Sequence, residues 1–189
     1  MSTIYLPVAA ADVLGIANDW NTEAVRAGKP GFTIITNTST GFAKTGRRLF
    51  GGGMLKMVPS TEKLYVMIHG DGNDGDNTFR VAGQRSNGKW REYSPENLAR
   101  HLEKEGLSKA HQDLRLAACN GGRPDSVGDS FASILKLWMA HLGYHNLTVY
   151  AYHGEILNIR GEFSDGSFHK LTSMTGDAYF RLSSQREAF

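Results

Sequence analysis

One cysteine and one histidine in this sequence stand where the two side chains could act together in acyl transfer. The only cysteine, Cys119, ends the mostly apolar run Leu114–Cys119 and is followed by Asn-Gly-Gly, while His69 ends the run Leu64–His69 and is followed by Gly70. A neighbouring imidazole can take the proton of a thiol, and backbone N–H groups of a tight turn can stabilise an oxyanion. The two residues therefore indicate a nucleophilic thiol, although a lone cysteine at a strand end is also a common small core residue.

The segments that would position these residues alternate between strand and helix. The expected strands are Phe32–Thr36, Leu64–His69, Leu114–Cys119 and Leu147–Tyr152; the expected helices run from the Ser94 cap to Gly106 and from about Asp129 to Gly143. Turn signals in the tail, between Ile156–Ile159 and Phe168–Leu171, predict a β-hairpin. The pattern predicts a single α/β domain whose parallel strands end at one edge, which brings His69 and Cys119 together.

Length and composition exclude several classes of protein. The 189 residues suffice for one domain, and 40% hydrophobic with 21% charged residues is typical of a soluble globular protein. A net charge of +2 gives no reason to expect nucleic-acid binding, and no segment is apolar enough to span a membrane. The N-terminus has no basic region of a secretory signal, so we expect a cytosolic protein or one exported without such a signal.

Other signals for ligands are weaker. A single cysteine excludes an intramolecular disulfide and a multi-cysteine zinc site. His141, His145 and His153 could bind zinc, but Gly143 breaks the helix between the first two. The glycines of the acidic stretch Asp71–Asp76 do not match a calcium loop, and Gly51-Gly52-Gly53 lacks the Gly-Lys-Ser/Thr of a phosphate loop. We predict no metal site.

Five short segments add to the cysteine and histidine. They are His69-Gly70-Asp71-Gly72-Asn73-Asp74, Tyr93–Leu102, Leu114–Cys119, Ser130-Phe131-Ala132 and His153–Ile159. In this order they resemble the cysteine protease domain of bacterial MARTX toxins and large clostridial glucosylating toxins. The resemblance covers about residues 63–171 and leaves 1–60 as an N-terminal extension of one domain, 1–189. The His69–Cys119 spacing of 50 positions also resembles that of caspases.

The resemblance implies a caspase-like fold, with Cys119 as nucleophile, His69 as base, and the N–H groups of Gly70 and Cys119 as oxyanion donors. Proteins of this family cleave after leucine and process their own toxin in the host cytosol. They are activated by inositol hexakisphosphate in a basic site formed partly by a C-terminal β-flap, which residues 155–171 resemble. Candidate cations for that site, which could equally be ordinary solvated charges, are Lys44, Arg47, Arg48, Lys56, Arg85, Lys89, Arg91, Arg160 and Lys170.

We therefore predict a bacterial toxin or secreted effector, a cysteine peptidase that cleaves a peptide bond in itself or in a host protein. The same two residues could instead serve a glutamine deamidase or transglutaminase. A third possibility is a degenerate protease fold that acts as a binding module, with Cys119 buried and inert. The basic, glycine-rich insert Gly83–Arg91 departs from the family pattern, as does a chain that is short beside the very long toxins.

Overall fold

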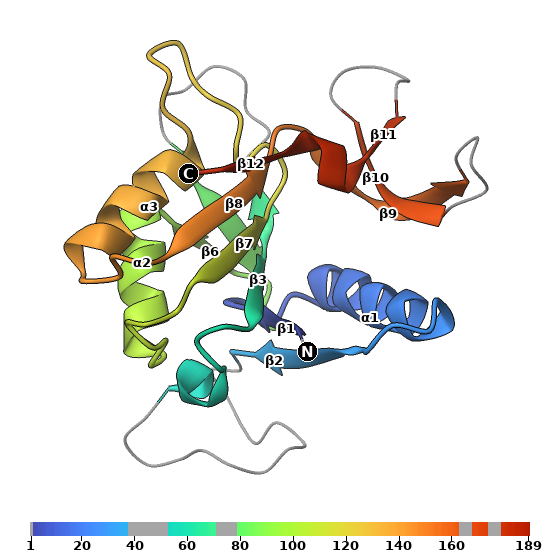
Figure 1. Ribbon diagram of the computed structural model, residues 1–189, viewed down its shortest axis with the longest axis horizontal. Helices are drawn as coiled ribbons and strands as arrows, with labels where there is room; N and C mark the ends of the chain where they lie inside the picture. The colour runs from blue at the N-terminus through green and yellow to red at the C-terminus, as the bar shows by residue number, and fades with distance from the viewer. Residues whose placement is uncertain (1, 38–52, 71–78, 163–167, 174–178) are drawn as a thin grey trace.

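The computed structural model of the protein describes residues 2–37, 53–70, 79–162, 168–173 and 179–189, with only the backbone described for 157–162 and 168–171. Its centre is a six-stranded sheet in the order β12-β8-β7-β3-β1-β2 (Figure 1). The strands are β1 (Ser2–Leu6), β2 (Phe32–Thr36), β3 (Lys63–Met67), β7 (Asp113–Ala117), β8 (Thr148–Tyr152) and β12 (Arg186–Ala188). All neighbours are parallel except β12, which pairs antiparallel with β8. The predicted α/β class with a mostly parallel sheet is confirmed.

Helices cover both faces of this sheet (Figure 1). Helices α2 (Pro95–Lys104) and α3 (Phe131–His141) pack together on one face, and α1 (Ala11–Arg26) lies on the other. Within the described part of the chain, no helix is long and apolar enough to cross a bilayer. Each helix on the α2 side begins where its sequence provides a cap, since the Ser94 hydroxyl accepts from Asn97 N–H at 3.2 Å and Ser130 forms a capping box with Ser133.

Side chains alternate between the two faces of the central sheet along each strand, and this explains why the buried residues form two clusters, one on each face. Leu64 and Val66 of β3 point into the cluster shared with α2 and α3, whereas Met67 belongs to the cluster shared with α1. In β7, Leu114 and Leu116 face the α2 side and Ala117 faces the α1 side in the same way. Burial on both faces is what the continuous apolar runs of these strands predict.

Two small antiparallel sheets extend from this frame. The first contains β4 (His69–Gly70), β5 (Val81–Gln84) and β6 (Trp90–Tyr93), and the second contains β9 (Glu155–Glu162), β10 (Phe168–Ser173) and β11 (Tyr179–Arg181). The antiparallel β9–β10 pair is the predicted C-terminal hairpin. The short helices η1 (Met54–Met57) and η2 (Leu182–Gln185) precede β3 and β12.

The structure differs from the sequence predictions mainly at strand ends and at the N-terminus. The strand predicted to continue to His69 stops at Met67, and His69 begins β4; the strand predicted to continue to Cys119 stops at Ala117. The segment assigned as an upstream extension provides β1, α1 and β2, and β1 lies inside the sheet between β3 and β2. Residues before and after position 60 in the sequence therefore both contribute strands to the sheet that supports the site.

Candidate active site

His69 and Cys119 follow two strands that are direct neighbours. Strands β3 and β7 pair in parallel up to Met67 and Ala117, and Ile68 N–H donates to the Ala117 carbonyl at 3.2 Å beyond the last pair. Gly70 then packs against the backbone of Cys119, because a Cβ at this glycine would overlap the Cys119 carbonyl oxygen. The carboxyl edge of the sheet thus brings the two candidate residues together, and only glycine allows the contact at position 70.

His69 is paired with a carboxylate that the sequence analysis did not identify. Its Nε2 lies 2.7 Å from Oδ2 of Asp12, in the first turn of α1. Burial would raise the pKa of Asp12, but hydrogen bonds from Val13 N–H and from His69 outweigh it and hold that pKa below its usual value. Because the pair fixes one ring nitrogen of His69, the other nitrogen, Nδ1, is left as the proton acceptor for a substrate or thiol.

The Cys119 sulfur lies against the start of β9. Ile156 N–H donates to Sγ at 3.3 Å, which places the first residues of the C-terminal hairpin beside the thiol. Burial raises the pKa of Cys119 above its ordinary value, and the nearby Glu155 carboxylate raises it further. The N–H groups of Ile156, Cys119 and Gly70 oppose this shift in pKa. In this conformation the sulfur is therefore a protonated thiol at neutral pH, surrounded by backbone donors.

The turn after Cys119 is anchored by the segment between β8 and β9. Asn120 has a φ of 55°, in the left-handed region that asparagine tolerates better than most residues. Its N–H donates to the Gly154 carbonyl at 3.0 Å, and Gly122 N–H donates to the Tyr152 carbonyl at 2.9 Å. These two donors are therefore occupied, whereas the N–H groups of Gly70 and Cys119 face the sulfur.

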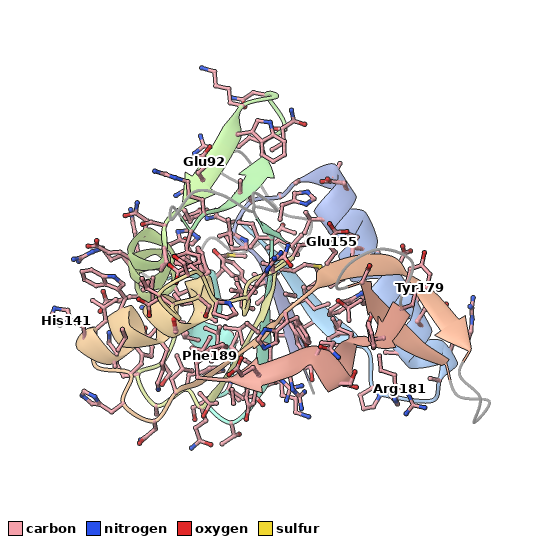
Figure 2. The ribbon with its side chains drawn as sticks, turned by 90° about the horizontal axis from the view of Figure 1, so that it is seen from above. Glu92, His141, Glu155, Tyr179, Arg181 and Phe189 are labelled. Carbon is pink, nitrogen blue, oxygen red and sulfur yellow. The ribbon has the colours of Figure 1, made fainter. Side chains whose placement is uncertain are left out.

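The cysteine and histidine side chains, both of which the structure describes, are not joined by a direct hydrogen bond. Asp12 holds His69 on the α1 side of the sheet edge, and Ile156 holds the sulfur from the β9 side. Figure 2 shows Glu155, the residue before Ile156, near the middle of the molecule where β9 begins. The edge therefore contains a base with its carboxylate, a thiol and backbone donors, with the thiol bonded to β9.

The candidate cations for a polyphosphate do not gather at one place among the described residues. Lys56 lies beside Gly106 at the end of α2, next to the Leu55–Glu105 hydrogen bond and at the amino edge of β7. On the β5–β6 hairpin, which follows the carboxyl edge, Arg85 and Lys89 are at the tip and Arg91 lies over the Tyr93 ring at 4.7 Å. The remaining candidates lie outside what the structure describes: Lys44, Arg47 and Arg48 altogether, and Arg160 and Lys170 in their side chains, although their backbones pair with each other.

The histidines considered for zinc lie in different surroundings. His153 forms an ion pair with Glu187 at 2.7 Å, and His141 stacks edge-on with Trp138. Over the ranges that the structure covers, no group of three or more His, Cys, Asp or Glu residues could hold a metal ion. The stretch Asp71–Asp76 and the glycines at 51 and 52 lie outside the described residues.

Three features of the site were missed from the sequence. Asp12 was not among the candidate residues, although an acid in the first turn of a helix after a strand was the available signal. Glu155 was noted only as part of a motif, and nothing in the sequence indicates that it lies near the sulfur. Trp90, whose ring centroid lies 6.1 Å from that of His69, was part of the insert.

No protein-family model matches the sequence, and no curated protein shows significant similarity to it.

Proposed function

We propose that the protein is a cysteine peptidase in which Cys119 attacks a peptide carbonyl and His69 moves the protons. The observation that carries the proposal is the convergence of His69, its carboxylate Asp12 and Cys119 at the carboxyl edge of two neighbouring strands. A thiol, a base and a group that orients the base are the elements that nucleophilic catalysis requires. The resemblance to the protease domain of bacterial toxins supports the same assignment and suggests an effector that acts on a protein in the host cytosol.

The reaction would run as follows. The Cys119 Sγ–H bond breaks as sulfur attacks the carbonyl carbon, and the proton passes to Nδ1 of His69. Asp12, bonded at Nε2, stabilises the imidazolium. The N–H groups of Gly70 and Cys119 donate to the oxyanion, and the imidazolium then protonates the leaving amine. Water, deprotonated by His69, hydrolyses the thioester and restores the thiol.

The position of the sulfur determines what the enzyme needs before the first step. Ile156 N–H must release Sγ, because the sulfur has to approach both a substrate carbonyl and His69. Since the pKa of Cys119 is raised, proton transfer to His69 during attack is more consistent with the geometry than a preformed thiolate. A substrate or ligand that shifts the start of β9 would therefore increase activity.

Activation by inositol hexakisphosphate remains a proposal that rests on the resemblance. The described candidate cations lie at opposite edges of the sheet, Lys56 at the amino edge of β7 and Arg85 and Lys89 beyond the carboxyl edge, so they do not form the converging set that a polyphosphate needs. No step of the reaction above involves this ligand, and its effect is measured as a separate arm of the experiments.

Two observations favour a second candidate function. The raised pKa of Cys119 and the lack of a direct hydrogen bond to His69 are also expected of a protease fold that serves as a binding module with an inert cysteine. The two functions differ in whether any product depends on Cys119.

The experiment is incubation of the purified protein with a proteome-derived peptide library and with host-cell lysate proteins, followed by mass spectrometry. Wild type, Cys119→Ala and His69→Ala are compared, each with and without inositol hexakisphosphate. We expect new peptide termini with wild type and none with Cys119→Ala. A gain of one dalton at glutamine without new termini would instead establish a deamidase, and identical spectra for all three proteins would contradict the peptidase proposal.

A further inference from the structure

The β5–β6 hairpin places an indole ring against the candidate base. The ring centroid of Trp90 lies 6.1 Å from that of His69, and the two ring planes are inclined by 59°. Aromatic rings at such a separation attract each other when one is tilted against the other. Trp90 is 57% exposed, and the mechanism above assigns it no role. The contact with His69 is therefore a better clue to the role of Trp90 than burial in the core.

Strand register explains how two rings on different strands meet. In the small sheet, β5 lies between β4, which carries His69, and β6, which carries Trp90. His69 pairs with Ala82, and Ala82 pairs with Glu92. Paired residues point to the same side, as do alternate residues of one strand, so Trp90 lies on the same face as these three residues. The side chain between the two rings is thus a single methyl group, which leaves room for them to meet across β5.

The opposite face of the hairpin holds β5 and β6 to the rest of the molecule. Val81 and Tyr93 on that face belong to the buried cluster shared with α2 and α3. Gly83 packs against Val8 so closely that a Cβ at this glycine would overlap the valine side chain. The strand that carries Trp90 therefore has a fixed position although its indole is exposed. For the same reason, truncation of the indole should leave the fold intact.

The ring of His69 needs more than one contact to hold its plane. The torsion that turns an imidazole has only broad preferences of its own, so surrounding groups must set the plane. The hydrogen bond with Asp12 fixes the position of Nε2, but the plane can still turn about that atom. The side chain of His69 is 34% exposed, so core packing alone does not immobilise it. The indole, which contacts the ring itself, restricts the remaining rotation.

We propose that Trp90 is a positioning residue that, together with Asp12, holds the His69 ring in the orientation from which Nδ1 takes the thiol proton. The two contacts reach the ring from different elements, α1 and β6, and each restricts a motion that the other allows. An indole also attracts a nearby cation, so Trp90 favours the imidazolium that His69 becomes during the reaction. This inference rests on the proposed peptidase function, because the positioned atom is the proton acceptor of that reaction.

The kinetic test compares wild type with Trp90→Ala and Trp90→Phe, and Leu137→Ala on α3 is the control for truncation of an exposed apolar side chain. We expect Trp90→Ala to lower kcat about fivefold with little change in KM, and Trp90→Phe to retain most of the rate. In the His69→Ala background, Trp90→Ala should have no further effect, because the indole acts only through His69. A rise in KM at unchanged kcat would assign the ring to substrate contact and overturn the inference.

An NMR measurement separates failure of this inference from failure of the proposed function. The probe is the relaxation of the imidazole carbons in protein that contains isotope-labelled histidine, with the His69 signals assigned from His69→Ala. Trp90→Ala should increase the motion of the His69 ring and leave that of the exposed His141 unchanged. Cleavage by wild type, with the motion of His69 unaffected by Trp90→Ala, would overturn the inference alone. Increased His69 motion without any Cys119-dependent cleavage would overturn the peptidase proposal alone, and the lack of both effects would overturn both.

Discussion

The two halves of the candidate site are prepared for chemistry to different extents. His69 already has its carboxylate partner, with Nε2 bonded to Asp12 at 2.7 Å, and its ring is partly open to solvent. Cys119, in contrast, is bonded to Ile156 N–H of β9, and burial together with Glu155 raises the pKa of its thiol. The candidate base is positioned by an element that packs on the central sheet, whereas the thiol is held by the start of the C-terminal hairpin. If the protein is the proposed peptidase, a substrate or ligand would change its activity at the Cys119 half of the site.

The largest effect is expected from removing the nucleophile. Cys119→Ala should lower hydrolysis by about four orders of magnitude or more, because no other group can form the thioester. The melting temperature should change little, since the substitution removes one partly buried sulfur. Peptide turnover and thermal denaturation measured on the same preparation test both statements. Turnover that survives in Cys119→Ala would refute the assignment of the nucleophile.

Removing the base should have the next largest effect. His69→Ala is expected to lower kcat about 10²- to 10⁴-fold, the range for loss of a general acid–base. His141→Ala, which truncates an exposed histidine at the end of α3, is the matched control and should leave kcat unchanged. A pH–rate profile of each variant is the measurement. If His69→Ala and His141→Ala behave alike, His69 is not the base.

A smaller effect is expected at the residue that positions His69. Asp12→Asn should reduce kcat about tenfold, because the imidazolium that forms on His69 during the reaction loses its carboxylate partner. The effect is modest because the pair is partly exposed to solvent. Asp19→Asn on the same helix is the control. If Asp12→Asn lowers the Tm but leaves kcat per folded molecule unchanged, Asp12 has a structural role only.

The smallest effect should come from the thiol's surroundings. Because the Glu155 carboxylate raises the pKa of Cys119, Glu155→Gln should lower that pKa and increase the rate of alkylation at neutral pH about two- to threefold. The sign follows from the thiolate fraction, which rises at fixed pH when the pKa falls. Iodoacetamide kinetics measure the change, with Glu96→Gln on α2 as control. A slower reaction in Glu155→Gln would contradict the electrostatic account of Cys119.

The part of the fold that could be predicted is the part with strong local signals. The runs of β3, β7 and β8 are apolar enough to be recognised as buried strands, and Ser94-Pro95 and Ser130 mark the helix starts. The strand ends were overestimated at His69 and Cys119, because apolar character continues after the ladder ends and the left-handed Asn120 turns the chain. The position of β1 inside the sheet depends on long-range pairing that a five-residue segment does not show.

The residues of the candidate site also fall into two groups, those that a local sequence signal identifies and those that only the fold brings to the site. His69 and Cys119 were identifiable because each stands at the end of an apolar run, and the topology of a parallel sheet then brings such ends together. Asp12 reaches His69 from 57 positions away in sequence, and Ile156 reaches the sulfur from 37. Those contacts depend on the packing of α1 on the sheet and of β9 across its edge, and no local pattern encodes either.

The most direct test of the central claim is the pH dependence of Cys119 alkylation by iodoacetamide in wild type and in His69→Ala. Both proteins are measured with and without inositol hexakisphosphate. The account predicts that the wild-type profile contains a component that disappears in His69→Ala, in at least one of the two conditions. A single titration above the ordinary pKa of a thiol, identical in both proteins under both conditions, would contradict it and leave Cys119 as an inert residue of a binding module.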